Sequence, residues 1–173
     1  MEFMNRTKIG FFLVTAVYLT ISLAITPVCH GGGFPPKSGY VEKVFDGDTI
    51  LVESGGRNYK VRLLGVDTPE VDGPYTRQEP FGPQASAMTK SLALGKRVKL
   101  VYGGKDIMDK HGRLLAYVIL PDGRDLNMIL IREGLAEAFH STKYTNKKLY
   151  HKLEKEAREA GKGLWRQKAG AGK

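Results

Sequence analysis

The chain has 173 residues, 42% of them hydrophobic, which is enough for one domain with a hydrophobic core but not for two. Lys and Arg outnumber Asp and Glu by 27 to 18, and the formal net charge of +9 favours a polyanionic partner. The single cysteine, Cys29, excludes an internal disulfide. The 4 histidines are scattered, without the spacing of a zinc site.

Residues 1–25 have the layout of a secretory signal peptide. Arg6 and Lys8 precede an uncharged, apolar run over residues 9–25, and Ser22-Leu23-Ala24 offers a small-x-small cleavage site. We therefore expect export, to the periplasm or out of the cell. The apolar run can also remain as a membrane anchor if it is not cleaved. The expected map is 1–25 signal peptide or N-terminal anchor, 26–38 flexible lead-in, 39–166 folded domain and 167–173 disordered tail.

Three β-strands are predicted at the start of the domain, over residues 40–45, 49–52 and 59–64. These runs are rich in β-branched and aromatic residues. Residues 54–58, between the second and third runs, consist of turn-forming residue types. The sequence therefore predicts a β-hairpin.

Charged residues flank this hairpin and meet at its open end. A turn centred near Gly56 pairs residue 48 with residue 64, so that Asp48 and Asp67 come together. Arg62 lies two residues further in along the same strand. The carboxylates that converge at this end are Asp46, Asp48, Asp67 and Glu70.

Carboxylates this close repel one another unless a cation lies among them, and all-oxygen ligation selects Ca²⁺ or Mg²⁺ over zinc or copper. The residues alone leave the choice between Ca²⁺ and Mg²⁺ open. An alternative without a site also exists, since Asp46-Gly47 is a common hairpin turn and residues 67–70 can form a turn followed by a helix cap. The position of both segments around one hairpin favours the metal site.

A second arginine follows a predicted turn. Residues 109–113 form the turn, and Arg113 begins the next strand, over residues 114–120. A guanidinium grips an oxyanion with two parallel hydrogen bonds, so Arg62 and Arg113 can clamp one phosphate from two sides. The alternative is a solvated turn with a surface arginine.

The later elements are mostly helical. Pro83 and Gly95 bracket one helix, a strand follows over residues 97–102, and a short helix over residues 126–133 ends at Gly134. Five strands with three appended helices suit a small β-barrel. The last helix is capped by Thr145, ends at Gly161 and carries an apolar stripe of Leu149, Leu153, Ala157 and Ala160, after which Leu164 and Trp165 pack against the barrel.

These motifs, in this order, resemble the thermonuclease family, whose type member is staphylococcal (micrococcal) nuclease. The resemblance covers roughly residues 39–166. It implies an α+β fold, namely a five-stranded OB-type β-barrel with three helices. The matching segments are 44–49, 62–70, 81–90, 109–117 and 133–136.

The resemblance also implies a metal site and a catalytic carboxylate. Asp48, Asp67 and the backbone carbonyl of Thr68 fall where the family binds a single Ca²⁺. Glu70 falls where the family places the carboxylate that activates or orients the attacking water. The choice of Ca²⁺ as the cofactor is made on this resemblance.

Five further residues are expected to contact the substrate. Arg62 and Arg113 fall on the two arginines with which the family holds the scissile phosphate and stabilises its transition state. Lys110 and His111 are candidates for binding the nucleic acid beside them, and Tyr144 is a candidate for contact with a base.

The implied reaction is metal-assisted hydrolysis of phosphodiester bonds in DNA and RNA, which leaves 5′-hydroxyl and 3′-phosphate ends. Contacts with the nucleic-acid backbone carry no sequence information, so binding is expected to be largely sequence-independent and sensitive to salt. We expect a monomer with no obligate protein partner. The alternative is a non-catalytic OB-fold nucleic-acid-binding module. The intact carboxylates and arginines favour the enzyme, because a pure binder has no need to hold like charges together.

Overall fold

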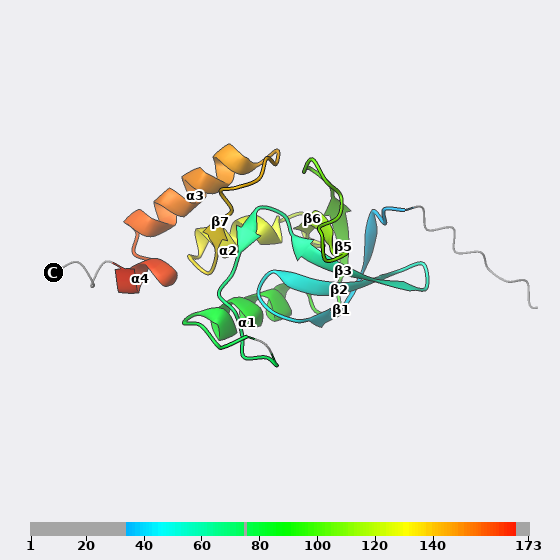
Figure 1. Cartoon of the computed structure of the whole chain (residues 1–173), viewed down its shortest axis with the longest axis horizontal. Helices are drawn as coiled ribbons and strands as arrows, with labels where there is room; N and C mark the ends of the chain where they lie inside the picture. The colour runs from blue at the N-terminus through cyan, green and yellow to red at the C-terminus, as the bar shows by residue number, and fades with distance from the viewer. Residues whose placement is uncertain (1–33, 75, 169–173) are drawn as a thin grey trace, which may run out of the picture.

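A β-barrel with helices around it forms the body of the molecule (Figure 1). The structure is a computed structural model and describes residues 34–74 and 76–168. The predicted α+β barrel fold is confirmed. The strands are β1 (Ser38–Val44), β2 (Thr49–Ser54), β3 (Arg57–Leu63), β4 (Val66–Asp67), β5 (Arg97–Val101), β6 (Leu114–Ile119) and β7 (Glu137–Ala138).

The barrel closes in the strand order β1-β2-β3-β6-β5, and β4 pairs with β7 in a separate two-stranded sheet. Barrel neighbours are antiparallel except for β3 and β6, which run parallel. Residue 48 lies opposite residue 63, where residue 64 was predicted, because the hairpin closes through a tight turn of Gly55 and Gly56, both with positive φ. Leu63 N donates to Asp48 O at 2.8 Å.

The barrel interior is apolar because alternate residues of each strand point inward. Ile50 and Val52 of β2 and Val61 and Leu63 of β3 are all 1% exposed or less. Full burial of one such side chain stabilises the fold by roughly 1.5–3 kcal/mol. The barrel therefore supplies a rigid platform, and the charged residues of β3 lie where it meets solvent.

Helices cover the barrel on two sides. α1 (Gly82–Ala93) packs along β1, and α2 (Leu126–Arg132) lies between β6 and α3 (Lys147–Glu159), which is the outer helix in Figure 1. α2 begins at Asp125, whose carboxylate accepts a hydrogen bond from Met128 N at 3.2 Å. A short helix, α4 (Leu164–Lys168), follows α3 and packs against it.

The end of the chain differs from prediction in several details. Thr145 does not cap α3, because its hydroxyl donates to Gly103 O at 2.9 Å and Asn146 takes the N-cap position. Leu149 is 41% exposed, and Tyr150, fully buried, occupies the core position instead. Ala160 is exposed as well. Trp165 is buried beneath the Arg158 guanidinium of α3.

The predicted signal peptide or anchor, together with Cys29 and most of the predicted lead-in, lies outside the described residues. β1 begins at Ser38, one residue before the predicted domain boundary. α4 reaches Lys168, two residues into the predicted tail, and residues 169–173 are outside the description. Among residues 34–74 and 76–168, no helix has the length and apolar character needed to cross a membrane.

Candidate active site

Asp48 is the buried centre of the carboxylate cluster. It precedes β2, and its side chain is 0% exposed. The Arg62 guanidinium pairs with Asp48 Oδ1, and the Thr49 hydroxyl donates to the same oxygen at 3.0 Å. Thr68 N donates to Oδ2 at 2.8 Å, which holds the Thr68 backbone beside this carboxylate. Asp48 thereby joins the start of β2, the end of β3 and the segment after β4.

Arg62 joins the two halves of the predicted site. It lies on β3, directly opposite Thr49. Its Nη2 donates to Asp67 Oδ1 at 2.6 Å and to Val66 O at 3.2 Å, while Nη1 bonds Asp48. The prediction that Asp48 and Asp67 converge at the open end of the hairpin is confirmed.

Asp46 is a third carboxylate at this place, and sequence reasoning assigned it no role. Its Oδ1 accepts a hydrogen bond from Asp48 N at 3.0 Å. Burial raises the pKa of Asp46, against the opposing effect of the Arg62 charge and of hydrogen bonds from Thr49. The signal in the sequence was the spacing of Asp46 and Asp48 on either side of one glycine.

The donor set fits a hard divalent cation. Asp46, Asp48 and Asp67 face one guanidinium, so the ionised groups carry two more negative charges than positive ones. Every side-chain donor among the three acids is a carboxylate oxygen, the ligand that Ca²⁺ and Mg²⁺ prefer. The Thr68 backbone is held against the same cluster and can contribute its carbonyl.

Glu70 lies at the exposed edge of the cluster, after Pro69. Glu70 N donates to Glu79 Oε2 at 3.0 Å, and Glu79 N donates to Glu70 O at 2.9 Å, so the two ends of the intervening loop hold each other. Burial raises the pKa of the Glu70 carboxyl, and the nearby charges of Asp46, Glu79 and Asp67 raise it further against Arg62. A raised pKa suits a group that accepts a proton.

α1 braces both segments that carry the acids. The Thr89 hydroxyl donates to Gly47 O at 2.6 Å, in a buried hydrogen bond. A Cβ at Gly47 would lie 2.7 Å from Ala85 Cβ and 2.8 Å from the Thr68 side chain. A Cβ at Gly82, the first residue of the helix, would lie 2.1 Å from Glu70 O. These glycines allow the helix to approach the site closely.

Arg113 is oriented by Asp109. Arg113 Nε donates to Asp109 Oδ2 at 2.7 Å, and the backbone N–H groups of His111 and Arg113 both donate to Oδ1 at 2.9 Å. Burial raises the pKa of Asp109, but these hydrogen bonds and the Arg113 charge outweigh it, so the net pKa is lowered. Sequence reasoning identified this segment as a turn and missed Asp109 as the residue that positions the arginine.

A pocket of about 390 Å³ brings the two arginines together. Arg62 and Arg113 both line it, and β3 and β6 are neighbours in the barrel. The predicted substrate residues Lys110 and His111 line the same pocket. Phe139 and Thr142, to which the sequence analysis gave no role, also line this pocket.

Tyr144 is not among the residues that line this pocket, and its contact with a base stays a prediction. It is 7% exposed, and its hydroxyl donates to Phe139 O at 3.0 Å. Burial raises its pKa to about 12. Its ring packs against Gly65, where a Cβ would lie 2.5 Å from the tyrosine ring. Tyr144 therefore supports the loop that carries Phe139.

An OB-type barrel that presents clustered carboxylates beside two arginines is typical of proteins that act on phosphate esters. The chain is a member of the staphylococcal nuclease homologue family, whose family model matches residues 60–167. The matched range contains Arg62, Asp67, Glu70 and Arg113.

Individual relatives agree with this assignment. The chain is 41% identical to the thermonuclease of Staphylococcus intermedius over 130 residues, which is 75% of this chain and 76% of that protein. It is 33% identical to the thermonuclease of Staphylococcus hyicus over 172 residues, 94% of this chain and 99% of that protein. It is 36% identical to endonuclease YncB of Bacillus subtilis over 129 residues, 72% of this chain and 60% of that protein.

Proposed function

We propose that this protein is an exported, Ca²⁺-dependent nuclease that hydrolyses phosphodiester bonds of DNA and RNA and leaves 5′-hydroxyl and 3′-phosphate ends. Membership of the family, with relatives named thermonuclease and endonuclease, supports a hydrolase acting on nucleic-acid phosphodiester bonds. The observation that carries the proposal is the convergence of Asp48 and Asp67 on Arg62, which lines one pocket together with Arg113.

Asp48, Asp67 and the backbone carbonyl of Thr68 are the proposed Ca²⁺ ligands, with the Asp46 carboxylate adding negative charge beside them. When bound, the cation polarises a phosphoryl oxygen of the substrate. The fully buried position of Asp48, fixed by donors from Thr49 and Thr68, keeps one ligand in place before the cation arrives. Pre-positioning of this kind lowers the cost of assembling the site.

Glu70 is the proposed base. Its exposed position lets it reach a water molecule, and its backbone is fixed by Glu79. The raised pKa of the Glu70 carboxyl favours transfer of a proton from that water as it attacks phosphorus. No nucleophilic side chain takes part in this mechanism.

Arg62 and Arg113 are the proposed clamp for the scissile phosphate. Their guanidinium groups present planar pairs of N–H donors that match two phosphate oxygens. Negative charge grows on those oxygens in the pentacoordinate transition state, so donors fixed in advance stabilise that state more than the substrate. Asp109 fixes Arg113 through its Nε, which leaves the terminal nitrogens for the phosphate.

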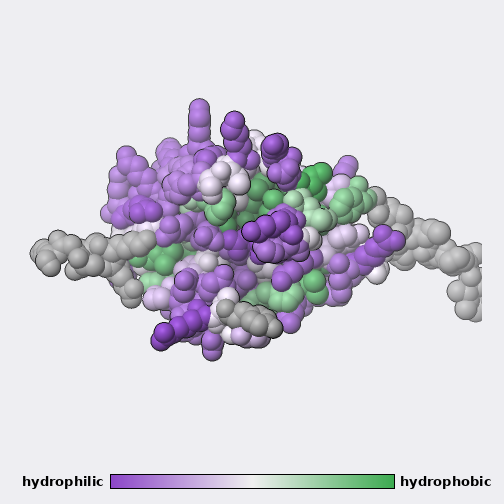
Figure 2. All heavy atoms as spheres, in the orientation of Figure 1, coloured by the Kyte–Doolittle hydropathy of each residue, from purple (hydrophilic) through white to green (hydrophobic). Residues whose placement is uncertain are grey.

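The surface suits a polyanionic substrate that is bound without regard to sequence. Hydrophilic side chains cover most of the face in Figure 2, with hydrophobic residues showing between them. The net charge of +9 attracts the phosphate backbone at long range. We propose a monomer that needs no protein partner.

Digestion of supercoiled plasmid and of single-stranded RNA, with and without EGTA, tests the reaction. Cleavage should stop in EGTA and return on addition of Ca²⁺. The products should serve as polymerase primers only after phosphatase treatment, because a 3′-phosphate blocks extension. Binding without cleavage would instead identify a nucleic-acid-binding module. Cleavage that persists in EGTA would contradict the proposed dependence on Ca²⁺.

Export is tested by fractionation of cells that make the full chain. The N-terminal apolar run supports export, with two outcomes for the mature protein. A shortened, soluble product outside the cytoplasm would indicate cleavage of the leader. A full-length product in the membrane fraction would indicate an anchor, and a full-length cytoplasmic product would contradict export.

A further inference from the structure

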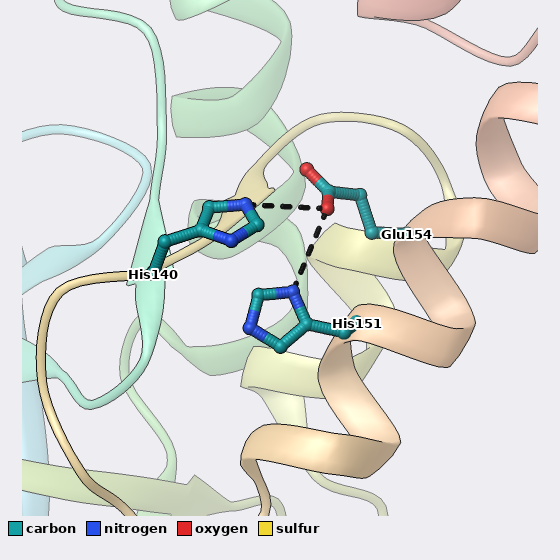
Figure 3. Close-up of side chains that lie close together, drawn as sticks. All are labelled: His140, His151 and Glu154. Carbon is teal, nitrogen blue, oxygen red and sulfur yellow. Dashed lines mark ion pairs between the residues drawn. The ribbon is translucent and has the colours of Figure 1, made fainter.

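Two histidines and one glutamate that are not part of the carboxylate cluster gather beside α3 (Figure 3). His140 lies on the loop between β7 and α3, while His151 and Glu154 lie on α3 with i,i+3 spacing. His140 Nε2 is 3.7 Å and His151 Nδ1 is 3.9 Å from Glu154 Oε2. The three potential ligand atoms all lie within 4.8 Å of one another.

The Glu154 side chain is only 6% exposed, and glutamate is rarely buried in proteins unless it is paired. Its Oε1 accepts hydrogen bonds from Ala138 N at 3.4 Å and from Arg158 Nη2 at 3.1 Å. The other oxygen, Oε2, faces the two imidazoles (Figure 3). The carboxylate is thus fixed in position with one oxygen directed at the histidines.

We propose that His140, His151 and Glu154 form a binding site for a borderline transition-metal dication of the Zn²⁺ type. Two imidazole nitrogens and one carboxylate oxygen are a ligand set that such an ion accepts in tetrahedral geometry, with the fourth position left to water. The set differs in kind from the all-oxygen cluster around Asp48, which suits Ca²⁺. The two sites therefore select different metals.

Metal binding requires the three ligand atoms to move closer together. Ligands about 2.0–2.1 Å from a tetrahedral ion lie about 3.3 Å apart, whereas the two nitrogens are 3.7 and 3.9 Å from Glu154 Oε2 and all three atoms lie within 4.8 Å of one another. The His140 side chain is 66% exposed and belongs to a loop, so it can rotate to close the gap. Its exposure also leaves the fourth position open to solvent.

Neighbouring charges set the affinity below that of a closed structural zinc site. Arg158 shares Glu154, and Lys147 Nζ donates to the backbone carbonyl of His140, so two cations lie near the ion.

The proposed ion would link the rim of the substrate pocket to α3. Phe139, next to His140, lines that pocket, as does Thr142 on the same loop. A metal bond from His140 to α3 restrains this loop, so Zn²⁺ is expected to slow amide hydrogen exchange over residues 139–144 in protein free of nucleic acid.

Titration of the chelator-treated full chain with Zn²⁺ by calorimetry tests the proposal, without Ca²⁺ or nucleic acid. Substitution by Co²⁺ should give the visible absorption of a tetrahedral complex. His140→Ala and Glu154→Gln should each weaken binding by at least about 10-fold, because even partners of ligands contribute that much. His111→Ala is the matched control, because it removes a histidine outside the cluster and should leave Zn²⁺ binding unchanged.

Each outcome decides the proposal separately from catalysis. Loss of binding in both cluster variants, with circular dichroism spectra like that of the parent, supports the site. His140→Ala changes an exposed loop residue, so it reports on binding even if Glu154→Gln is poorly folded. Equal Zn²⁺ affinity in the parent and in His140→Ala, or no binding by the parent, overturns it.

Discussion

Arg62 bonds two carboxylates in the structure and is also the proposed ligand of the scissile phosphate. Its contacts with Asp48 and Asp67 hold the guanidinium at the edge of the pocket. Only 17% of its side chain is exposed, so little conformational freedom remains to be lost when a phosphate binds. The same residue therefore links the metal ligands to the substrate.

Glu70→Gln tests the proposed base. The amide keeps the size of the side chain but cannot accept a proton from water, so turnover should fall by roughly 10²- to 10⁴-fold. Substrate affinity should change little, because the side chain is not part of the phosphate clamp. Single-turnover cleavage and fluorescence binding measure the two quantities. Turnover equal to that of the parent would move the base to another residue.

Lysine substitutions test the phosphate clamp. Arg62→Lys and Arg113→Lys keep the charge but lose the planar pair of donors, so each should lower turnover by about 10²-fold or more. Lys110→Ala is the comparison. Loss of a lysine that contacts only the nucleic-acid backbone should weaken binding and reduce the slope of log affinity against log salt concentration by about one. If both lysine variants turn over normally, the two arginines belong to the general basic surface.

Sequence reasoning predicted that the proposed site residues Asp48, Arg62 and Asp67 lie together because they are close along one hairpin. The spacing around Gly56 placed Asp48 and Asp67 together even though the register was one residue off. The burial of Tyr144 could not be predicted, because an aromatic residue on a loop gives no sign of whether it faces solvent or Gly65. The pairing of His140 with His151 depends on how the loop before α3 folds back, which spacing does not reveal.

The turn between β5 and β6 should lose stability in a pH-dependent way when Asp109 is changed. The folded-state pKa of Asp109 is lowered, so its contribution is present above the ordinary value of 3.8 and is lost as the pH falls through the lowered folded value. Asp109→Asn should therefore reduce the free energy of unfolding by roughly 1–3 kcal/mol at neutral pH. Urea unfolding measured from pH 7 to pH 2 should show that the difference in the free energy of unfolding between the parent and Asp109→Asn disappears at acid pH. A constant difference would contradict the ionic role.

Helix α1 should influence catalysis through its first residue. Gly→Ala within a helix usually stabilises by roughly 0.5–1 kcal/mol, but a Cβ at Gly82 would lie 2.1 Å from Glu70 O. Gly82→Ala should therefore displace Glu70 and lower turnover by about 10²-fold. Ser91→Ala, on the exposed part of the same helix, is the control and should leave turnover unchanged. Normal turnover in Gly82→Ala would show that the loop adjusts freely.

The sequence predicted the long elements better than the short ones. The five barrel strands and the three longer helices each have enough residues for a period of 2 or 3.6 to be visible. β4 and β7 have two residues each, and they pair only because α2 and α3 bring them together. On α3 Leu149 was the predicted core residue, but Tyr150 is buried in its place. The Tyr150 hydroxyl donates a hydrogen bond to Asp125, at the start of α2.

The fold as a whole is expected to form without the proposed cation. The buried residues form one hydrophobic cluster that extends from β1 to α3, whereas the carboxylates lie at the barrel edge. Arg62 already offsets part of their repulsion. The barrel should therefore fold without metal, unlike small domains whose stability is supplied by a bound ion.

Removal of Ca²⁺ should accordingly abolish cleavage while leaving the barrel intact. In EGTA the near-ultraviolet circular dichroism spectrum should stay that of a folded protein, because the aromatic residues Tyr117 and Tyr150 pack in the core, away from the carboxylates. The Tm should rise once the Ca²⁺ concentration exceeds the dissociation constant Kd of the Ca²⁺ complex. An ion that binds only the folded state stabilises the folded protein by RT ln(1 + [Ca²⁺]/Kd). Asp67→Asn should reduce this increase without unfolding the protein, because Asp67 is an exposed residue of the cluster. Loss of the aromatic signal in EGTA would show instead that the cation holds the fold together.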